Sequence, residues 1–384
     1  MNFETKLIHG SGDVDAATGS VSTPIYQTST FHQFDINNFG KYDYSRSGNP
    51  TRDILESLIA KLENGTRGFA FSSGMAAICS VLSIFSAGDH IIICSDVYGG
   101  TYRAATKLFS RFNLEFTFVN ASDINNISNA FKDNTKAIYL ETPSNPLLKV
   151  TDLRSAIALA KKYNAVTIVD NTFMSPYLQR PLELGADIVV HSATKFLNGH
   201  SDVICGLAVT NNQELADRIY SVQNTFGAIL GPQDCFLLIR GIKTLKARMD
   251  IHQNNALKLA QHLETLDSIE KVYYLGLESC EGRELHFSQA SGAGAVLSFK
   301  FKDIKTTEYF LKNVKNVAVA VSLGGVETIV SYPVKMSHAS IPREERLSLG
   351  ITDTLIRVSV GLEDIDDLIS SFDEAIEMSL SSNI

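Results

Sequence analysis

Short apolar runs alternate with segments of helical spacing between residues 68 and 210, and this alternation limits the possible folds more than any other feature of the sequence. Parallel strands that are joined by helical crossovers are covered on both faces, so they read as apolar runs. The runs lie at 68–71, 90–94, 114–119, 136–140, 165–170, 186–190 and 206–210. They predict an α/β fold with a mostly parallel, seven-stranded sheet.

The pattern changes along the chain and divides it into three predicted parts. Residues 1–45 are polar, broken by Gly and Pro and rich in aromatic side chains, so they predict an arm that has no core of its own. Residues 46–240 contain the seven runs, and residues 241–384 contain fewer. A chain of 384 residues exceeds the size at which a single core stops growing. We therefore expect a large domain at 46–240 and a smaller C-terminal α/β domain at 241–384.

Further elements are predicted from local patterns. Strands are expected at 294–301 and 356–360, and helices at 51–65, 74–86, 151–163, 241–266 and 364–379.

Composition narrows the function class. The net charge is −8 and acidic and basic residues are interleaved, so no basic cluster offers a face for nucleic acid or an anionic membrane. No segment approaches the roughly 18 apolar residues of a membrane span, and the N-terminus has no apolar signal core. The five cysteines are odd in number and widely spaced, which indicates reduced thiols rather than a disulfide frame or a zinc site. These features predict a cytoplasmic protein with a small-molecule ligand.

Lys195 stands just after the apolar run 186–190, among small hydroxyl residues. Ligands of parallel α/β sheets gather at the carboxyl ends of the strands, which makes a functional amine there plausible. The alternative is a solvated loop lysine, because lysine is rarely fully buried.

Two further features could bind charged parts of a ligand. Ser72, Ser73 and Gly74 separate a predicted strand from a predicted helix, and a helix N-terminus can bind an anion, although an ordinary N-cap explains the same pattern. Asp170 ends the run 165–170, where a buried carboxylate needs a donor or a cation, either as a structural cap or as a functional partner.

An aromatic residue and an arginine complete the set. Tyr98 follows the run 90–94 and precedes two glycines, although packing against protein explains a tyrosine equally well, and Arg357 lies inside an apolar strand, where it needs an anion. Pyridoxal 5′-phosphate bound to an amino acid requires an amine, an anion-binding helix N-terminus, a carboxylate, an aromatic ring and an arginine. This sequence offers all five. The ring nitrogen would pair with Asp170, and Arg357 would hold the substrate carboxylate.

These positions lie in motifs that closely resemble the Cys/Met-metabolism family of pyridoxal-phosphate enzymes over nearly the whole chain. The motifs are YSRSGNPT (44–51), SSGMAA, VYGGTYR, ETPSNP (141–146), VDNTF (169–173), DIVVHSATKFLNGHSDVICG, SLGGVET (322–328) and RVSVGLED. The resemblance implies fold-type I, similar to aspartate aminotransferase.

The resemblance also implies roles for single residues. Lys195 would bind the cofactor covalently and move the Cα proton, and Tyr98 would stack on the ring as the second catalytic residue. The other cofactor contacts would come from Asp170 to the ring nitrogen and, at the phosphate, from Gly74, Met75, Ser192 and Thr194.

Two more sets of residues follow from the resemblance. Tyr44 and Arg46 would reach the cofactor phosphate of a neighbouring subunit, which implies a homo-oligomer, usually a dimer of dimers. Arg357, helped by Asn145 and Ser322, would bind the substrate carboxylate.

The reaction is expected from departures within the motifs. Val321 stands before SLGG, where synthases and many γ-lyases of the family carry glutamate, and Gly100 stands where methionine γ-lyases carry cysteine. Several segments look most like bacterial β-lyases, so we expect β-elimination of cystathionine to homocysteine, pyruvate and ammonia, with cysteine desulfhydration as a side reaction. The alternatives are γ-elimination from cystathionine or homocysteine and, less expected, γ-synthase chemistry.

Two other classes fit the sequence less well. A nucleotide-binding oxidoreductase would need a third glycine after Gly292 and Gly294, but Leu297 occupies that position. A noncatalytic homologue is disfavoured because no chemically required position is replaced. His191 and His200 have no partnering ligand at i+3 or i+4, so both are expected to be structural and no metal site is predicted. His338 is expected to be a loop or core histidine rather than a substrate contact.

Overall fold

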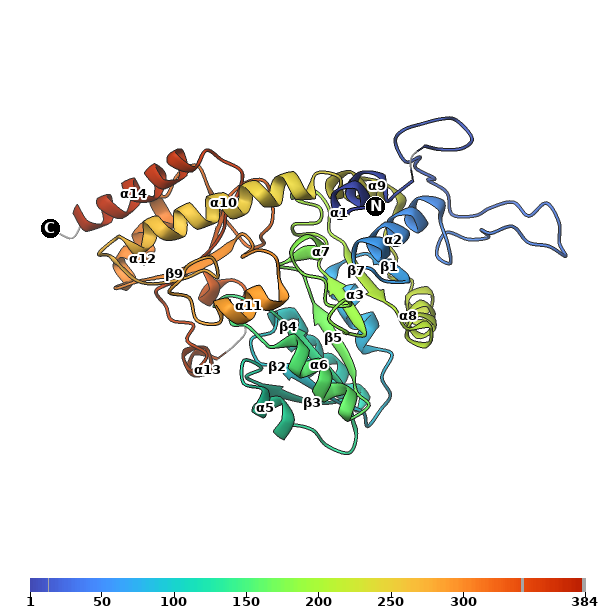
Figure 1. Cartoon of the computed structure of the whole chain (residues 1–384), viewed down its shortest axis with the longest axis horizontal. Helices are drawn as coiled ribbons and strands as arrows, with labels where there is room; N and C mark the ends of the chain where they lie inside the picture. Colours follow the sequence, from blue (N-terminus) through green and yellow to red (C-terminus); the bar gives the residue numbers. More distant parts are fainter. Residues whose placement is uncertain (13, 340–341, 382–384) are drawn as a thin grey trace.

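The computed structural model describes residues 1–12, 14–339 and 342–381, and within these residues it contains two sheets (Figure 1). The larger sheet has the strand order β1-β7-β6-β5-β4-β2-β3. Only β7 runs antiparallel to its neighbours, so the predicted mostly parallel, seven-stranded sheet is confirmed. Its strands are β1 (Arg67–Phe71), β2 (His90–Cys94), β3 (Glu115–Val119), β4 (Thr135–Glu141), β5 (Val166–Asp170), β6 (Ile188–His191) and β7 (Gly206–Thr210).

Helices cover both faces of this sheet because its strands alternate between two cores. Along β1, Phe69 and Phe71 join a cluster with α3 (Gly74–Leu82) and α8 (Gln213–Phe226), whereas Ala70 joins the cluster of α2 (Pro50–Leu62) and α9 (Pro232–Ile242). Successive side chains of a strand point to opposite faces, so α3 and α2 lie on opposite sides. The other helical segments up to β7 are α4 (Gly99–Arg103), the π-helix η1 (Ala104–Leu108), the 3-10 helix η2 (Phe109–Phe112), α5 (Ile124–Asn129), α6 (Leu153–Lys162) and α7 (Ser175–Leu178).

The smaller sheet has the order β10-β11-β12-β9-β8 and is antiparallel except between β10 and β11. Its core is aromatic, since Phe299, Phe301, Phe310 and Phe372 contact one another. Strands β9 (Val296–Phe301) and β12 (Leu355–Ser359) match the two predicted strands, whereas β8 (Ile269–Tyr273), β10 (Ala318–Val319) and β11 (Ile329–Ser331) were not predicted. The remaining segments are α11 (Arg283–Gln289), α12 (Ile304–Asn313), η3 (Pro333–Lys335), α13 (Arg343–Ser348) and α14 (Ile365–Ser381).

One long helix, α10 (Leu245–Glu264), connects the two sheets (Figure 1). It packs against β8, β9 and α14 in the smaller part. At its other end the Arg248 guanidinium donates to the carbonyls of Phe196 at 2.7 Å and Gly241 at 2.8 Å. Helix α10 is therefore bonded to the turn that contains Lys195.

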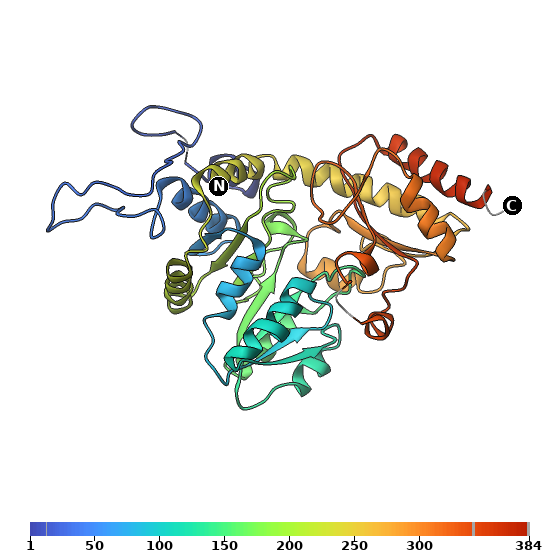
Figure 2. The same ribbon diagram turned by 180° about the vertical axis from the view of Figure 1, so that it is seen from behind.

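The N-terminal segment begins with α1 (Phe3–His9), which packs on α2, and then extends away from the body of the chain in both views (Figures 1 and 2). After α1 it forms extended loops in which Phe34 is 94% and Ile36 84% exposed. The body begins at α2, where the Asn49 side chain accepts the N–H groups of Thr51 and Arg52. The predicted domain boundaries at 45/46 and 240/241 remain predictions. Among the described residues, no helix is long and apolar enough to cross a membrane.

Candidate active site

The carboxyl ends of β4, β5 and β6 meet at one edge of the larger sheet. Glu141 lies in register with Asp170, and Asp170 lies in register with Val190. Lys195 follows β6 within one turn, its N–H bonded to the Ser192 carbonyl at 3.1 Å. Parallel pairing thus brings Asp170 and the Lys195 turn to the same edge.

Asp170 is a buried carboxylate whose hydrogen-bond donors are all neutral. Its Oδ1 accepts the N–H of Thr172 at 3.0 Å and the Thr172 hydroxyl at 2.5 Å, and its Oδ2 accepts the Tyr139 hydroxyl at 3.2 Å. Burial raises the pKa of Asp170, and the bonds from Thr172 oppose that rise. Within the described residues no lysine or arginine forms an ion pair with Asp170, so this edge presents a carboxylate that lacks a cation.

Lys195 is half-buried, and its amine is held at a defined place. Its Nζ donates to Ser322 Oγ at 2.6 Å. Burial, followed by the charge of Arg357, lowers the pKa of Lys195 to about 8. A neutral amine is therefore accessible near physiological pH, as a base or a nucleophile requires.

Arg357 is buried on β12 and is held by two of the residues predicted to assist it. Its guanidinium donates to Asn145 Oδ1 at 3.0 Å and to the Ser322 carbonyl at 2.6 Å, and a third bond goes to Ser331 Oγ at 2.9 Å. Burial lowers the pKa of Arg357 to about 10. Its Nε is buried and has no hydrogen-bond partner among the described residues. A donor of this kind suits an anionic ligand.

The loop that contains Ser322 is pressed against the lysine turn. Ser322 has φ of 89°, a left-handed conformation that is unusual for a non-glycine residue. Gly324 has φ of +83°, and a Cβ there would lie 2.6 Å from the Phe196 nitrogen and 2.8 Å from the Lys195 carbonyl carbon. The strained serine and the close glycine keep the loop on Lys195.

The start of α3 lies against the segment after β6. A Cβ on Gly74 would lie 2.7 Å from the Cβ of Ser192 and 2.8 Å from its Oγ. Ser73 Oγ accepts the N–H of Ala76, so the N–H groups of Gly74 and Met75 lack an acceptor within the helix. This arrangement forms an anion seat in which Ser192 supplies a hydroxyl beside the helix N-terminus.

Tyr98 precedes α4 and is held through its backbone. Its N–H donates to Glu141 Oε2 at 2.9 Å. A Cβ on Gly100 would lie 2.4 Å from Tyr98 Cε1 and 2.6 Å from Met75 Sδ, so the ring, the thioether and this glycine are in close contact. The Tyr98 side chain remains 41% exposed, which leaves ring surface for a ligand.

Glu141 is the second buried carboxylate of this edge. Burial and the neighbouring Asp170 raise the pKa of Glu141 well above its usual range. Two carboxylates in register share one low-dielectric site, so they resist being ionised together.

Two residues of the predicted set have local partners. Thr194 Oγ1 donates to the Cys205 carbonyl at 3.2 Å and accepts the Cys205 N–H at 2.9 Å. His191, expected to be structural, is buried and bonded to Glu63 Oε1 at 2.6 Å. The phosphate contact of Thr194 stays a prediction.

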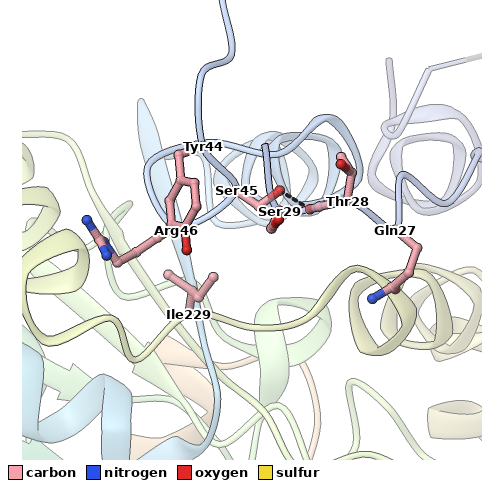
Figure 3. Close-up of a pocket in the computed structure, with 7 residues that line it drawn as sticks. All are labelled: Gln27, Thr28, Ser29, Tyr44, Ser45, Arg46 and Ile229. Atoms are coloured by element: carbon pink, nitrogen blue, oxygen red, sulfur yellow. Dashed lines mark hydrogen bonds between the residues drawn. The ribbon is translucent and has the colours of Figure 1, made fainter. Parts of the chain in front are cut away.

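Tyr44 and Arg46 lie apart from this edge, in a pocket at the base of the arm (Figure 3). The Arg46 guanidinium lies 5.3 Å from the centroid of the Tyr44 ring, and its Nε donates to Asn224 Oδ1 at 3.4 Å. Across the described residues no hydrogen bond or ion pair joins either side chain to Lys195 or Asp170. The pocket is also lined by Gln27, Thr28, Ser29, Ser45 and Ile229.

The sequence interpretation missed four polar residues of the site. Thr172 donates to Asp170 and accepts the Ser192 N–H at 2.8 Å, Tyr139 donates to Asp170, Glu141 holds Tyr98 and Ser331 supports Arg357. Thr172 could have been found from its position two residues after an aspartate at a strand end. The other three depend on strand register.

The residues present fit pyridoxal phosphate. Gly74 leaves room at the anion seat that a side chain would fill, Asp170 lacks a cation that a protonated ring nitrogen would supply, and Lys195 offers an amine that deprotonates near pH 8. Gly74, Met75 and Ser192 would hold the phosphate, Asp170 the ring nitrogen and Lys195 the aldehyde.

Comparison with known proteins gives consistent results. The family model described as "Cys/Met metabolism PLP-dependent enzyme" matches residues 4–377. A cystathionine β-lyase of Bacillus subtilis is 52% identical over 375 residues, which cover 98% of this chain and 96% of that protein. A cystathionine γ-lyase of the same organism is 51% identical over 377 residues, which cover 98% of this chain and all of that protein.

A solved structure is equally similar. The crystal structure of cystathionine γ-lyase from Lactobacillus plantarum, complexed with L-serine, superposes with a TM-score of 0.96 at 47% identity. The match covers 98% of this chain and 99% of that chain.

Proposed function

The chain belongs to the Cys/Met metabolism PLP-dependent enzyme family, and from this premise we propose that it is a carbon–sulfur lyase that cleaves cystathionine by β-elimination. The products are homocysteine, pyruvate and ammonia, and homocysteine supplies methionine synthesis. The observation that carries the proposal is the Lys195 amine, hydrogen-bonded to Ser322 whose carbonyl accepts from Arg357. The loop that contains Ser322 thus joins Lys195, the proposed base, to Arg357, the proposed binding group for the substrate carboxylate.

Each residue has a distinct task in this proposal. Pyridoxal phosphate, when bound, supplies an electron sink for the substrate Cα. Lys195 takes the Cα proton, because its lowered pKa makes the neutral amine available. Arg357 binds the substrate carboxylate through paired hydrogen bonds while Asn145 and Ser331 hold its guanidinium in place. Asp170 keeps the ring nitrogen protonated, and Tyr98 covers the ring.

Position 321 favours β- over γ-elimination. Val321 is 64% exposed and adjoins Ser322, so it lies beside the Lys195 amine's hydrogen-bond partner without adding charge. A glutamate there would attract the distal ammonium group of cystathionine and change how the substrate lies. The similarity to bacterial β-lyases supports the same choice.

γ-Elimination from cystathionine, giving cysteine and 2-oxobutyrate, is the second candidate. It is favoured by relatives named γ-lyases at 51% identity and, for a solved structure, at 47% identity.

Product analysis with cystathionine separates the two reactions. Pyruvate with homocysteine is expected, and 2-oxobutyrate with cysteine as the main products would overturn β-elimination in favour of γ-elimination. Val321→Glu is the matched variant and should raise the 2-oxobutyrate share, with Val319→Glu, on the exposed part of β10, as the control that leaves the ratio unchanged.

We also infer a homo-oligomer, a dimer of dimers, in the cytoplasm. The apolar side chains of the arm are exposed in the single chain, and Tyr44 with Arg46 would complete the phosphate site of a neighbouring subunit. All five cysteines are unpaired, which suits a reducing compartment.

A further inference from the structure

We propose that Tyr139 is a positioning residue that directs the negative charge of two neighbouring buried carboxyl groups to Asp170. The inference rests on the proposed function, in which Asp170 faces the ring nitrogen of the cofactor. Tyr139 would thereby decide which carboxylate is available to that nitrogen.

Strand register places the three side chains together. Tyr139 and Glu141 are two residues apart on β4, so they project from the same face of the sheet. Glu141 pairs with Asp170 on β5, and the Tyr139 hydroxyl donates to Asp170 Oδ2 at 3.2 Å. All three side chains are buried.

The hydrogen bonds to the two carboxyl groups are evenly matched without Tyr139. Asp170 accepts the N–H and the hydroxyl of Thr172, while Glu141 is stabilised by the backbone N–H groups of Tyr98 and Asn145. The Tyr139 hydroxyl is a third donor, and it donates to Asp170 and not to Glu141. Since hydrogen bonds to a carboxylate stabilise its ionised form, this donor favours charge on Asp170.

Two charges also act on this pair, since His191 lowers the pKa of Asp170 and Arg357 interacts with Glu141. The ionisable groups near the pair are Tyr139 and Glu141 on β4, His191 on β6, Cys94 on β2, and Asp96 with Arg357 at the rim. Burial raises the pKa of both carboxyl groups, and the hydrogen bonds from Thr172 and Tyr139 oppose that rise at Asp170. His191 is itself bonded to Glu63.

Tyr139→Phe tests the inference because it removes only the hydroxyl. Tyr274→Phe is the matched control, since Tyr274 is equally buried and its hydroxyl donates to the Gly294 carbonyl at 2.9 Å, in the smaller part of the chain. The full-length holoenzymes are dialysed against a series of free pyridoxal phosphate concentrations, and the bound cofactor is measured by its absorbance. Absorption spectra are recorded across pH, and both variants are checked for equal melting temperature.

Tyr139→Phe should raise the Kd for pyridoxal phosphate roughly tenfold, the lower range for a lost hydrogen bond to a charged group. The pH at which its spectrum changes should move, and neither change should occur in Tyr274→Phe. In an Asp170→Asn background the effect of Tyr139→Phe should shrink to about twofold or less, because the charge to be directed is gone.

Three results overturn the inference alone: a Tyr139→Phe Kd within twofold of wild type, an equal loss in Tyr274→Phe, or an undiminished effect in Asp170→Asn. A wild-type chain that binds no pyridoxal phosphate would overturn both this inference and the proposed function.

Discussion

The edge of the larger sheet and the N-terminal arm differ in how far one chain completes them. At the sheet edge Asp170, Arg357 and the Lys195 amine are all hydrogen-bonded within the same chain. In the arm, Phe34 and Ile36 are almost fully exposed, and Arg46 makes one long side-chain hydrogen bond to Asn224. The comparison indicates that one chain holds Lys195, Asp170 and Arg357 in place, whereas the arm leaves apolar side chains uncovered, as the proposed oligomer would require.

The largest effect is expected at the sheet edge, from Lys195→Ala. Loss of the base should lower pyruvate formation from cystathionine by about 1,000-fold or more, and the variant should hold cofactor without a covalent bond. Lys132→Ala is the control, because Lys132 forms only an exposed ion pair with Glu115. Turnover of Lys195→Ala near that of the control would remove Lys195 from the mechanism.

The same lysine should give the cofactor-free protein a distinctive pH dependence. Its pKa is 10.5 when solvated and about 8 in the fold, so below pH 8 the buried charge destabilises the fold. Between pH 8 and 10.5 the folded protein releases this proton while the unfolded chain retains it, and the penalty is relieved. At about 1.4 kcal/mol per pH unit the penalty is about 3 kcal/mol.

Lys195→Met should therefore be more stable than wild type at pH 7, and the difference should shrink by pH 10. Urea unfolding of both cofactor-free chains measures it, and the comparison cancels the titration of the other groups. A difference that is constant from pH 7 to 10 would contradict the buried charge.

A smaller effect is expected in the arm, from Arg46→Ala. Cofactor retention should weaken by about tenfold, as for one lost charged hydrogen bond, while the melting temperature stays unchanged because the side chain is exposed. Arg111→Ala, at another exposed arginine, is the control.

Hybrids sharpen this comparison of the two regions. Mixing Arg46→Ala with Lys195→Ala subunits should restore part of the activity, because some sites would combine an intact sheet edge with an intact arm. Absence of rescue in a verified hybrid would show that the two regions do not share a site between chains.

Local sequence predicted the strands of the larger sheet because each is an apolar run and most are followed by a helix, although β3 is only half-buried and β6 leads into the Lys195 turn. It did not predict β8, whose residues Glu270 and Lys271 are exposed, or β10, which is two residues long, because neither carries a periodic apolar signal. The positions of Lys195 and Asp170 were predictable in the same way, since Asp170 ends a recognisable strand and Lys195 follows one.

The contacts between side chains on different strands could not be predicted from the sequence in this way. The bonds from Tyr139 to Asp170 and from Tyr98 to Glu141 depend on how β4 pairs with its neighbours, and one residue of slippage would turn those side chains to the other face. In the sequence, Tyr139 looked like an ordinary residue of an apolar strand, and Glu141 was noted only as part of the ETPSNP motif. Such partners become visible only when the register is known.

Helix α10 gives the molecule a mechanical link between its halves. Its 20 residues span about 30 Å, with one end bonded through Arg248 to the turn of Lys195 and the other packed under the sheet that carries Arg357. The helix thereby helps to hold Lys195 at a defined distance from Arg357. In the proposed enzyme, a helix outside the site therefore supports the spacing between the base at the substrate Cα and the group that binds its carboxylate.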